Sequence, residues 1–338
     1  MLSRPFVAAI KFASTLILLS FAFAPQLSGQ SSPLPDSPPP TVHLAPEIQS
    51  RIADLRQILA EAVLAKDAHR QAVVLNHIGA LYYAHADAVD ALPAFNQTLA
   101  LVRKFKQPAA EATALSDVGA SHFALGHAEE ALDAYKQALP LWRIAGNKDH
   151  EAATLGDIAE VFRALNDTDE ALRFDLQSLP LQVQAGNRAG QAAVLNNIGL
   201  VYFARHDRKK SLDYFDQAIT IYRSLGNKLG EATSLNNIGG VYNQFGDRRK
   251  AIELFATALP IFKQIDDRRA QANTLNNMGL AYAHLGEAAR ALECYNQALP
   301  VYRDSGDQRG FEAATKNIHM LYADRRNRPA LEASSRTN

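Results

Sequence analysis

The sequence predicts an all-α solenoid, in which helical hairpins stack side by side. Two adjacent stretches show the repeat most clearly. They are GNRAGQAAVLNNIGLVYFARHDRKKSLDYFDQAITIYRS at 186–224 and GNKLGEATSLNNIGGVYNQFGDRRKAIELFATALPIFKQ at 226–264, so the period is 40 residues without insertion or deletion. A fixed period of roughly 20–50 residues is typical of units that bury their apolar faces only on their neighbours. The spacing of apolar residues within each copy indicates two helices.

The N-terminal segment, residues 1–24, is expected to be a secretory signal. Two basic residues precede an apolar run over 12–24, which is too short to span a bilayer because a membrane helix needs about 20 residues. Ala22, Phe23 and Ala24 resemble a cleavage site. We therefore expect export to the periplasm or the medium. An uncleaved N-terminal membrane anchor and an intracellular protein are the alternatives.

A linker at 25–45 leads into the repeat array at 46–323. Its stretch SSPLPDSPPP is too rich in proline for a helix or a central strand and is expected to be extended. The array then begins with a lone second helix, because a terminal unit must face water on one side. Six full units at about 67–306, a capping helix at 308–323 and a polar tail at 324–338 are expected to follow.

Each full unit is expected to hold two helices of about 17 residues. Aspartates are expected to cap the second helices, at Asp167, Asp207 and Asp247. Glycines are expected to end them in a left-handed conformation, at Gly146, Gly186, Gly226 and Gly306. Prolines fall inside the second helices and predict a regular bend, at Pro140, Pro180, Pro260 and Pro300.

Two columns of small residues predict where the helices of a hairpin approach each other. A glycine inside a helix costs about 1 kcal/mol relative to alanine, so its recurrence in the first helix indicates a close approach. The glycine column holds Gly79, Gly119, Gly199, Gly239 and Gly279, and Ala159 interrupts it. The column expected opposite, on the second helix, holds Ala91, Ala131, Ala171, Ser211, Ala251 and Ala291.

These hairpins resemble tetratricopeptide repeats over about residues 47–323. The residues that match the packing signature of that family are Leu195, Ile198, Gly199, Tyr202, Phe215 and Ala218. The period of 40 exceeds the family's usual 34, and the LNNIG and QALP phrasing is similar to kinesin light chains and to arrays that precede caspase-like CHAT domains. The resemblance implies a right-handed superhelix of antiparallel hairpins, whose first helices line a concave, peptide-binding groove.

A double row of amides is the candidate binding site. The first column holds Asn76, Asn196, Asn236 and Asn276, and the second holds Asn197, Asn237, Asn277 and Asn317, with Asp117 and Asp157 in two earlier units. The resemblance places both columns at or beside the groove, where an amide can pair with a ligand backbone. The concentration of asparagine predicts the strongest binding in units four to six. Alternatively, one column bonds to neighbouring loops and holds the stack in register.

The family pattern adds further residues to the groove lining. They are Tyr83, Phe123, Phe203, Asn243 and His284. The aromatic rings would suit apolar side chains of a ligand, and core packing is the alternative for Phe123 and Phe203. The first asparagine column lacks the lysine of the family's carboxylate-clamp variant, so the acidic C-terminus of a chaperone is not the expected ligand.

The sequence shows no motif for catalysis, a metal or a cofactor. It has no HExxH, CxxC, phosphate-binding loop or nucleophile elbow. The 35 Lys and Arg balance the 35 Asp and Glu, so no overall field favours nucleic acid or an anionic membrane. Cys294 is the only cysteine and stands in a column that indicates packed interior. Early second helices begin with acidic pairs and later ones with basic runs, such as Glu129-Glu130 and Arg208-Lys209-Lys210, all expected to be solvated.

We therefore expect an exported, non-enzymatic scaffold that binds a protein or a peptide in its groove. Two other classes stay open. The array could self-assemble through its exposed ends, or it could be a sensor module separated from an effector such as a caspase-like protease. The residues do not identify the ligand.

Overall fold

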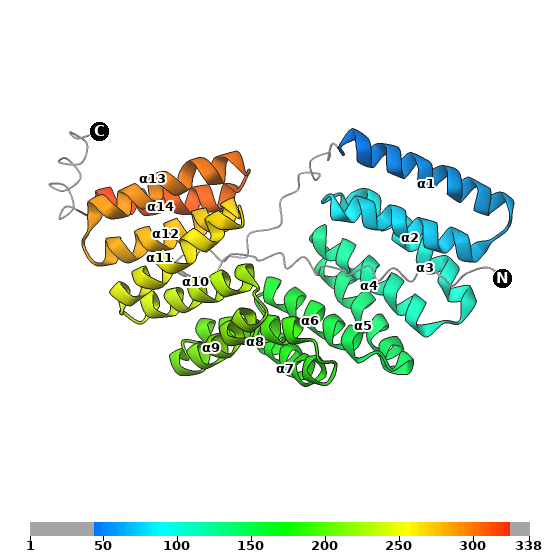
Figure 1. Cartoon of the computed structure of the whole chain (residues 1–338), viewed down its shortest axis with the longest axis horizontal. Coiled ribbons are helices and arrows are strands. Elements are labelled where there is room, and N and C mark those ends of the chain that lie inside the picture. The colour runs from blue at the N-terminus through cyan, green and yellow to red at the C-terminus, as the bar shows by residue number, and fades with distance from the viewer. Residues whose placement is uncertain (1–43, 325–338) are drawn as a thin grey trace. The chain divides into compact units, whose positions relative to one another are not determined.

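The computed structural model of the protein describes residues 44–324, and its regular elements there are all helical (Figure 1). This confirms the predicted all-α fold. The predicted signal at 1–24 and most of the linker lie outside the described residues. The described chain forms two compact units, 44–241 and 242–324, which divide inside α10.

The N-terminal unit is a stack of antiparallel hairpins preceded by one lone helix, as predicted. Even-numbered helices are the first helices of hairpins and odd-numbered helices are the second. The elements are α1 (Pro46–Leu64), α2 (Ala68–Ala84), α3 (Ala88–Val102), the 3-10 helix η1 (Arg103–Phe105), α4 (Pro108–Ala124), α5 (Ala128–Ala145), α6 (Lys148–Ala164), α7 (Thr168–Gln184), α8 (Arg188–Ala204), α9 (Arg208–Ser224) and α10 (Lys228–Gln244). Each helix packs on the next within the hairpins and between α1 and α2.

The C-terminal unit begins within α10 and ends with a single first helix. Its remaining elements are α11 (Arg248–Gln264), α12 (Arg268–His284), α13 (Ala288–Asp304) and α14 (Gln308–Ala323). The bounds of α14 agree with the predicted capping helix at 308–323. No described helix is both long enough and apolar enough to cross a membrane.

The turns follow the predicted chemistry with one exception. Asp167 and Asp207 accept hydrogen bonds from the backbone N–H groups of Glu170 and Lys210, as helix caps do. Asp247 precedes α11 but makes no such side-chain bond, so that prediction is wrong. The four glycines predicted to end second helices all have φ between 65° and 69°, which is the left-handed region. The four predicted prolines lie inside α5, α7, α11 and α13 without ending them.

The glycine column makes room for aromatic rings as well as for the small residues that we expected opposite it, since the Ser211 hydroxyl donates to the Gly199 carbonyl at 2.9 Å. A Cβ added at Gly119 would lie 2.9 Å from the Tyr135 ring, and one at Gly79 would lie 2.7 Å from the Phe95 ring. The same contact recurs between Gly199 and Phe215 and between Gly279 and Tyr295. An aromatic side chain buries far more apolar area than alanine, so this contact dominates the packing of the hairpin.

The hairpin of α6 and α7 replaces this contact with a buried ion pair. Ala159 stands in the glycine column, and Asp175 stands where the other hairpins have an aromatic residue. Arg163 Nη1 donates to Asp175 Oδ2 at 2.6 Å, and the Arg163 guanidinium also pairs with Glu160. Burial raises the pKa of Asp175 to about 7, against the charge of Arg163, which lowers it. An ion pair thus holds α6 and α7 together at the position where the neighbouring hairpins use an aromatic ring.

Candidate binding face on the first helices

The first helices pack against one another as well as against their hairpin partners. α4 contacts α6 directly, and in the C-terminal unit α12 contacts α14. The two asparagine columns occupy adjacent positions on each first helix, as Asn196 and Asn197 do on α8. Small side chains stand about one helical turn away along the same helices, as at Ala120, Ala153 and Ala193. A face lined by small residues leaves its amides and carboxylates room to meet another chain.

The asparagine columns pair with each other across successive repeats. Asn237 Nδ2 donates to Asn196 Oδ1 at 3.1 Å within the N-terminal unit, and Asn317 Nδ2 donates to Asn276 Oδ1 at 3.1 Å within the C-terminal unit. Asn76 Nδ2 donates to Asp117 Oδ2 at 2.8 Å. Each bond joins a first-column residue to the second-column residue 41 positions later. The amides therefore hold neighbouring repeats in register, through one another and not through the loops.

This pairing leaves the two columns with different exposure. Asn196 and Asn276 of the first column are only 3% and 2% exposed, so their contacts lie within the protein. Asn197, Asn237 and Asn277 of the second column are half-buried and reach the surface. Asn236 is also half-buried, and both Asn236 and Asn277 make interactions of their own. Asn76 is half-buried as well and Asn317 is buried, so the second column is the more accessible one on α8 and α12.

The self-pairing is interrupted around α6. By the same register, Asp157 follows Ser116 and Asn197 follows Gly156. The Ser116 hydroxyl has no hydrogen-bond partner in the described chain, and Gly156 offers no side chain. A Cβ added at Gly156 would meet nothing within 4 Å, so the surface there is open. No hydrogen bond joins the Asn197 side chain to the residues that the structure describes.

Two carboxyls and two phenols cluster at this interruption. Burial raises the pKa of Asp117 to about 7, although its hydrogen bond from Asn76 lowers it. Burial and then the charge of Glu160 raise the pKa of Asp157 to about 7, but its side chain stays exposed, so contact with water limits that shift. Burial and the charges of Asp157 and Asp117 raise the pKa of Tyr83 and that of the buried Tyr135. The four groups therefore lie close enough to interact electrostatically, and they favour a cationic or hydrogen-bond-donating ligand.

The other predicted lining residues are placed unevenly. Phe203 is 4% exposed and belongs to the core, whereas Phe123 is half-buried and packs beside Tyr135 and its neighbours. Asn243 is half-buried, and its buried Oδ1 has no hydrogen-bond partner in the described chain. His284 is exposed, although partial desolvation and then the charge of Arg248 lower its pKa.

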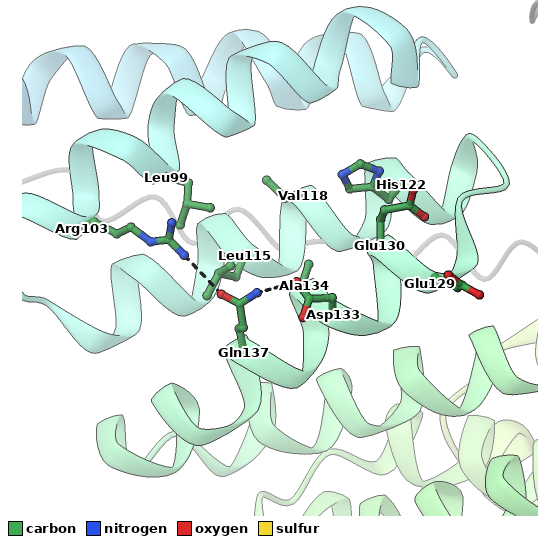
Figure 2. A pocket seen from close by; sticks show the side chains of 10 residues that line it. All are labelled: Leu99, Arg103, Leu115, Val118, His122, Glu129, Glu130, Asp133, Ala134 and Gln137. Atoms are coloured by element: carbon green, nitrogen blue, oxygen red, sulfur yellow. Dashed lines mark hydrogen bonds between the residues drawn. The ribbon is translucent and has the colours of Figure 1, made fainter.

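A cavity that was not predicted from the sequence lies on the second-helix side of the N-terminal unit (Figure 2). It has a volume of about 610 Å³ and lies between α3 and α5, with α4 as its floor. A smaller cavity of about 380 Å³ lies at α8 and α9, where Leu195 and Gln217 repeat the positions of Leu115 and Gln137. The signal in the sequence was the acidic start of α5, which we interpreted as a solvated helix end. Among the described residues, no cluster of His, Cys, Asp or Glu could hold a metal ion.

Comparison with known proteins agrees with the repeat architecture. A sequence model of the tetratricopeptide repeat matches residues 110–182, 190–264 and 250–304, which together make up more than half of the chain. A comparison with curated protein sequences gives no match.

Solved structures share the fold at low sequence identity. The apo form of the quorum sensor NprR from B. thuringiensis has a TM-score of 0.67 and 16% identity, over 86% of this chain and 81% of that one. BtubC (BKLC) from P. vanneervenii has a TM-score of 0.57 and 20% identity, over 65% and 92%. The apo form of RapI has a TM-score of 0.58 and 14% identity, over 77% and 99%.

Proposed function

Because the chain belongs to the tetratricopeptide repeat family, whose fold is typical of protein-binding modules, we propose that it is a scaffold that binds an extended segment of a partner along its first helices. The second asparagine column and the carboxylates beside it would contact the partner's backbone. We also propose that residues 1–24 direct export, so that the partner is met in the periplasm or the medium.

The spacing of the repeats suits a ligand in extended conformation. First helices of successive repeats stand about 10 Å apart at usual helix packing distances. An extended peptide advances about 3.3 Å per residue, so one side chain per repeat meets about every third ligand residue. Each such hydrogen bond contributes about 0.5–1.5 kcal/mol. Contacts along several repeats therefore add up to specific but modest affinity.

The interruption of the amide ladder is the observation that supports this proposal most. Asn237 already donates one N–H to Asn196, whereas neither the half-buried Asn197 nor the exposed Asp157 has such a bond within the described chain. A polar group that folding leaves without a partner is available to a ligand at no cost in internal bonds. We therefore move the expected centre of binding from units four to six toward the face of α4, α6 and α8. The acidic groups there favour a segment that carries lysine or arginine, or backbone N–H groups aimed at the carboxylates.

Partner capture with paired variants tests the proposal. Asn197→Ala removes no hydrogen bond of the described chain, so it separates binding from stability. We expect Asn197→Ala to weaken binding of the captured partner roughly 2- to 10-fold, and Asn197→Ala with Asp157→Ala to weaken it further. Gln217→Ala, an amide truncation on the second-helix side, should have no effect. Equal affinity of the wild type and the double variant, with unchanged thermal stability, would reject the proposed face.

A further inference from the structure

The cavity between α3 and α5 combines an apolar floor with an acidic wall (Figure 2). The floor is formed by Leu115 and Val118 of α4 together with Leu99 of α3, and the wall by Glu129, Glu130 and Asp133 from the first two turns of α5. All three acidic side chains are exposed. Gln137 closes one end, because it accepts a hydrogen bond from Arg103 at 3.3 Å and donates one to Asp133 at 2.7 Å.

The charge of this wall is not neutralised by an ion pair within residues 44–324. No ion pair joins Glu129, Glu130 or Asp133 to a residue of the described chain, and Arg103 is engaged by Glu111 at 3.1 Å. The positive end of α5 stabilises the two glutamates of its first turn, but this effect fades within that turn and does not account for Asp133.

The equivalent positions in later repeats lack this property. In the next repeat, Asp169 pairs with Arg205, and Glu170 pairs with Arg173. One repeat further, lysines stand at the same two positions. The uncompensated acidic wall is therefore specific to one repeat, beside the larger of the two cavities. Its carboxylates and the apolar floor together favour a partner segment that carries both a cationic and an apolar side chain.

The chain itself carries a segment of this composition. Residues 325–331 read RRNRPAL, so three arginines precede an apolar leucine. Arginine is suited to carboxylates because its planar guanidinium offers paired N–H donors. The formal net charge of the whole chain is zero, so two copies do not repel each other at long range. We propose that the cavity between α3 and α5 binds residues 325–331 of a second copy of this chain.

In this contact the arginines pair with the carboxylates of Glu129, Glu130 and Asp133, and Leu331 covers the apolar floor. The binding segment and the cavity are different surfaces of the same chain. Each copy can therefore bind a second copy through its cavity and a third through its segment, so the association is head to tail. The ion pairs are exposed to solvent and screened by salt, so the association is weak and falls with ionic strength.

Sedimentation velocity of the purified full chain tests the proposal. We expect the average mass to rise with concentration between about 10 and about 200 µM at low salt, and to return to that of a monomer in about 0.5 M salt, where the screening length is below about 5 Å. A monomer at every concentration in low salt overturns the proposal, whether residues 325–331 are unbound or bind within the same molecule.

A charge exchange identifies the surfaces. Glu129→Arg with Glu130→Arg and, separately, Arg325→Glu with Arg326→Glu should each weaken association at least about 10-fold, and mixing the two variants should restore it. Glu47→Arg with Asp54→Arg on α1 changes the net charge as the first pair does and should leave association unchanged. Fluorescence of Trp142 confirms that each variant is folded. Association that is insensitive to both pairs, or a mixture that stays monomeric, contradicts the assignment.

Discussion

The buried ion pair between α6 and α7 allows a quantitative test of how this repeat is held together. Arg163→Met removes the guanidinium and leaves the Asp175 carboxyl, which is 0% exposed, without its partner. Breaking a buried pair from one side costs about 3–5 kcal/mol. The cost should be larger at pH 8 than at pH 5, because the isolated carboxyl is buried more favourably when it is protonated.

A variant that restores the pattern of the neighbouring hairpins provides the matched comparison. Ala159→Gly with Arg163→Phe and Asp175→Phe installs the residue types found at Gly199, Phe203 and Phe215. Replacing a buried pair by packed apolar residues is often neutral or stabilising, by up to about 4 kcal/mol. The triple variant should therefore be at least as stable as the wild type, although it lacks the same ion pair as Arg163→Met.

Urea unfolding measures both variants. Trp142 is the only tryptophan and is 2% exposed in α5, so its fluorescence reports unfolding of the adjacent hairpin. Hydrogen exchange of α6 and α7 adds a local free energy of opening, which is needed because repeat arrays open in parts. A decrease of less than about 1 kcal/mol in the free energy of unfolding of Arg163→Met, or a triple variant less stable than Arg163→Met, would contradict this role of the ion pair.

Three further predictions concern pH, packing and the cysteine. Folding raises the pKa of Asp117 from 3.8 to about 7, so the stability that its protonated form contributes is lost as pH rises through about 4–7. Asp117→Asn should therefore reduce the fall in melting temperature over this pH range. An unchanged dependence of melting temperature on pH would contradict this prediction. Gly119→Ala should lower the free energy of unfolding in urea by about 1–3 kcal/mol, because the new Cβ would lie 2.9 Å from the Tyr135 ring. Gly156→Ala should raise it by up to about 1 kcal/mol, because a Cβ there meets nothing within 4 Å. Equal effects of the two substitutions would contradict the packing role of Gly119. Burial raises the pKa of Cys294 to about 11, so a thiol reagent should label it only as fast as the chain opens, and rapid labelling of the folded chain would contradict this.

The period of 40 residues was enough to predict the hairpins and their ends. Leu195, Ile198 and Gly199 recur in register, and each position has one packing role, so the pattern determines which face is buried. The last helix, Gln308–Ala323, was predicted to the residue because the same columns continue through it. Handedness and curvature were expected from family resemblance, and they depend on small rotations between repeats that no single column encodes.

The binding face was harder to predict because an amide can serve two purposes. Asn196 and Asn197 are neighbours in the sequence and look alike there. Only the structure shows that the first is buried and accepts a bond from Asn237, while the second reaches the surface. Hydrogen bonds between residues 41 positions apart depend on how repeats stack, and the sequence pattern is the same whether such a bond forms or not. The departures at Gly156 and Asp157 were visible in the sequence, but their meaning depended on knowing this pairing.

Site-specific photocrosslinking shows which face of the array holds the partner. A photoreactive residue is placed at Thr113, Ala153 or Ala193 on the first helices, or at Asp133 or Asp213 on the second-helix side, and the captured partner is mapped by mass spectrometry. We expect crosslinks from the three first-helix positions, at points spaced about every third residue along one partner segment. Crosslinks confined to Asp133 and Asp213 would contradict this expectation.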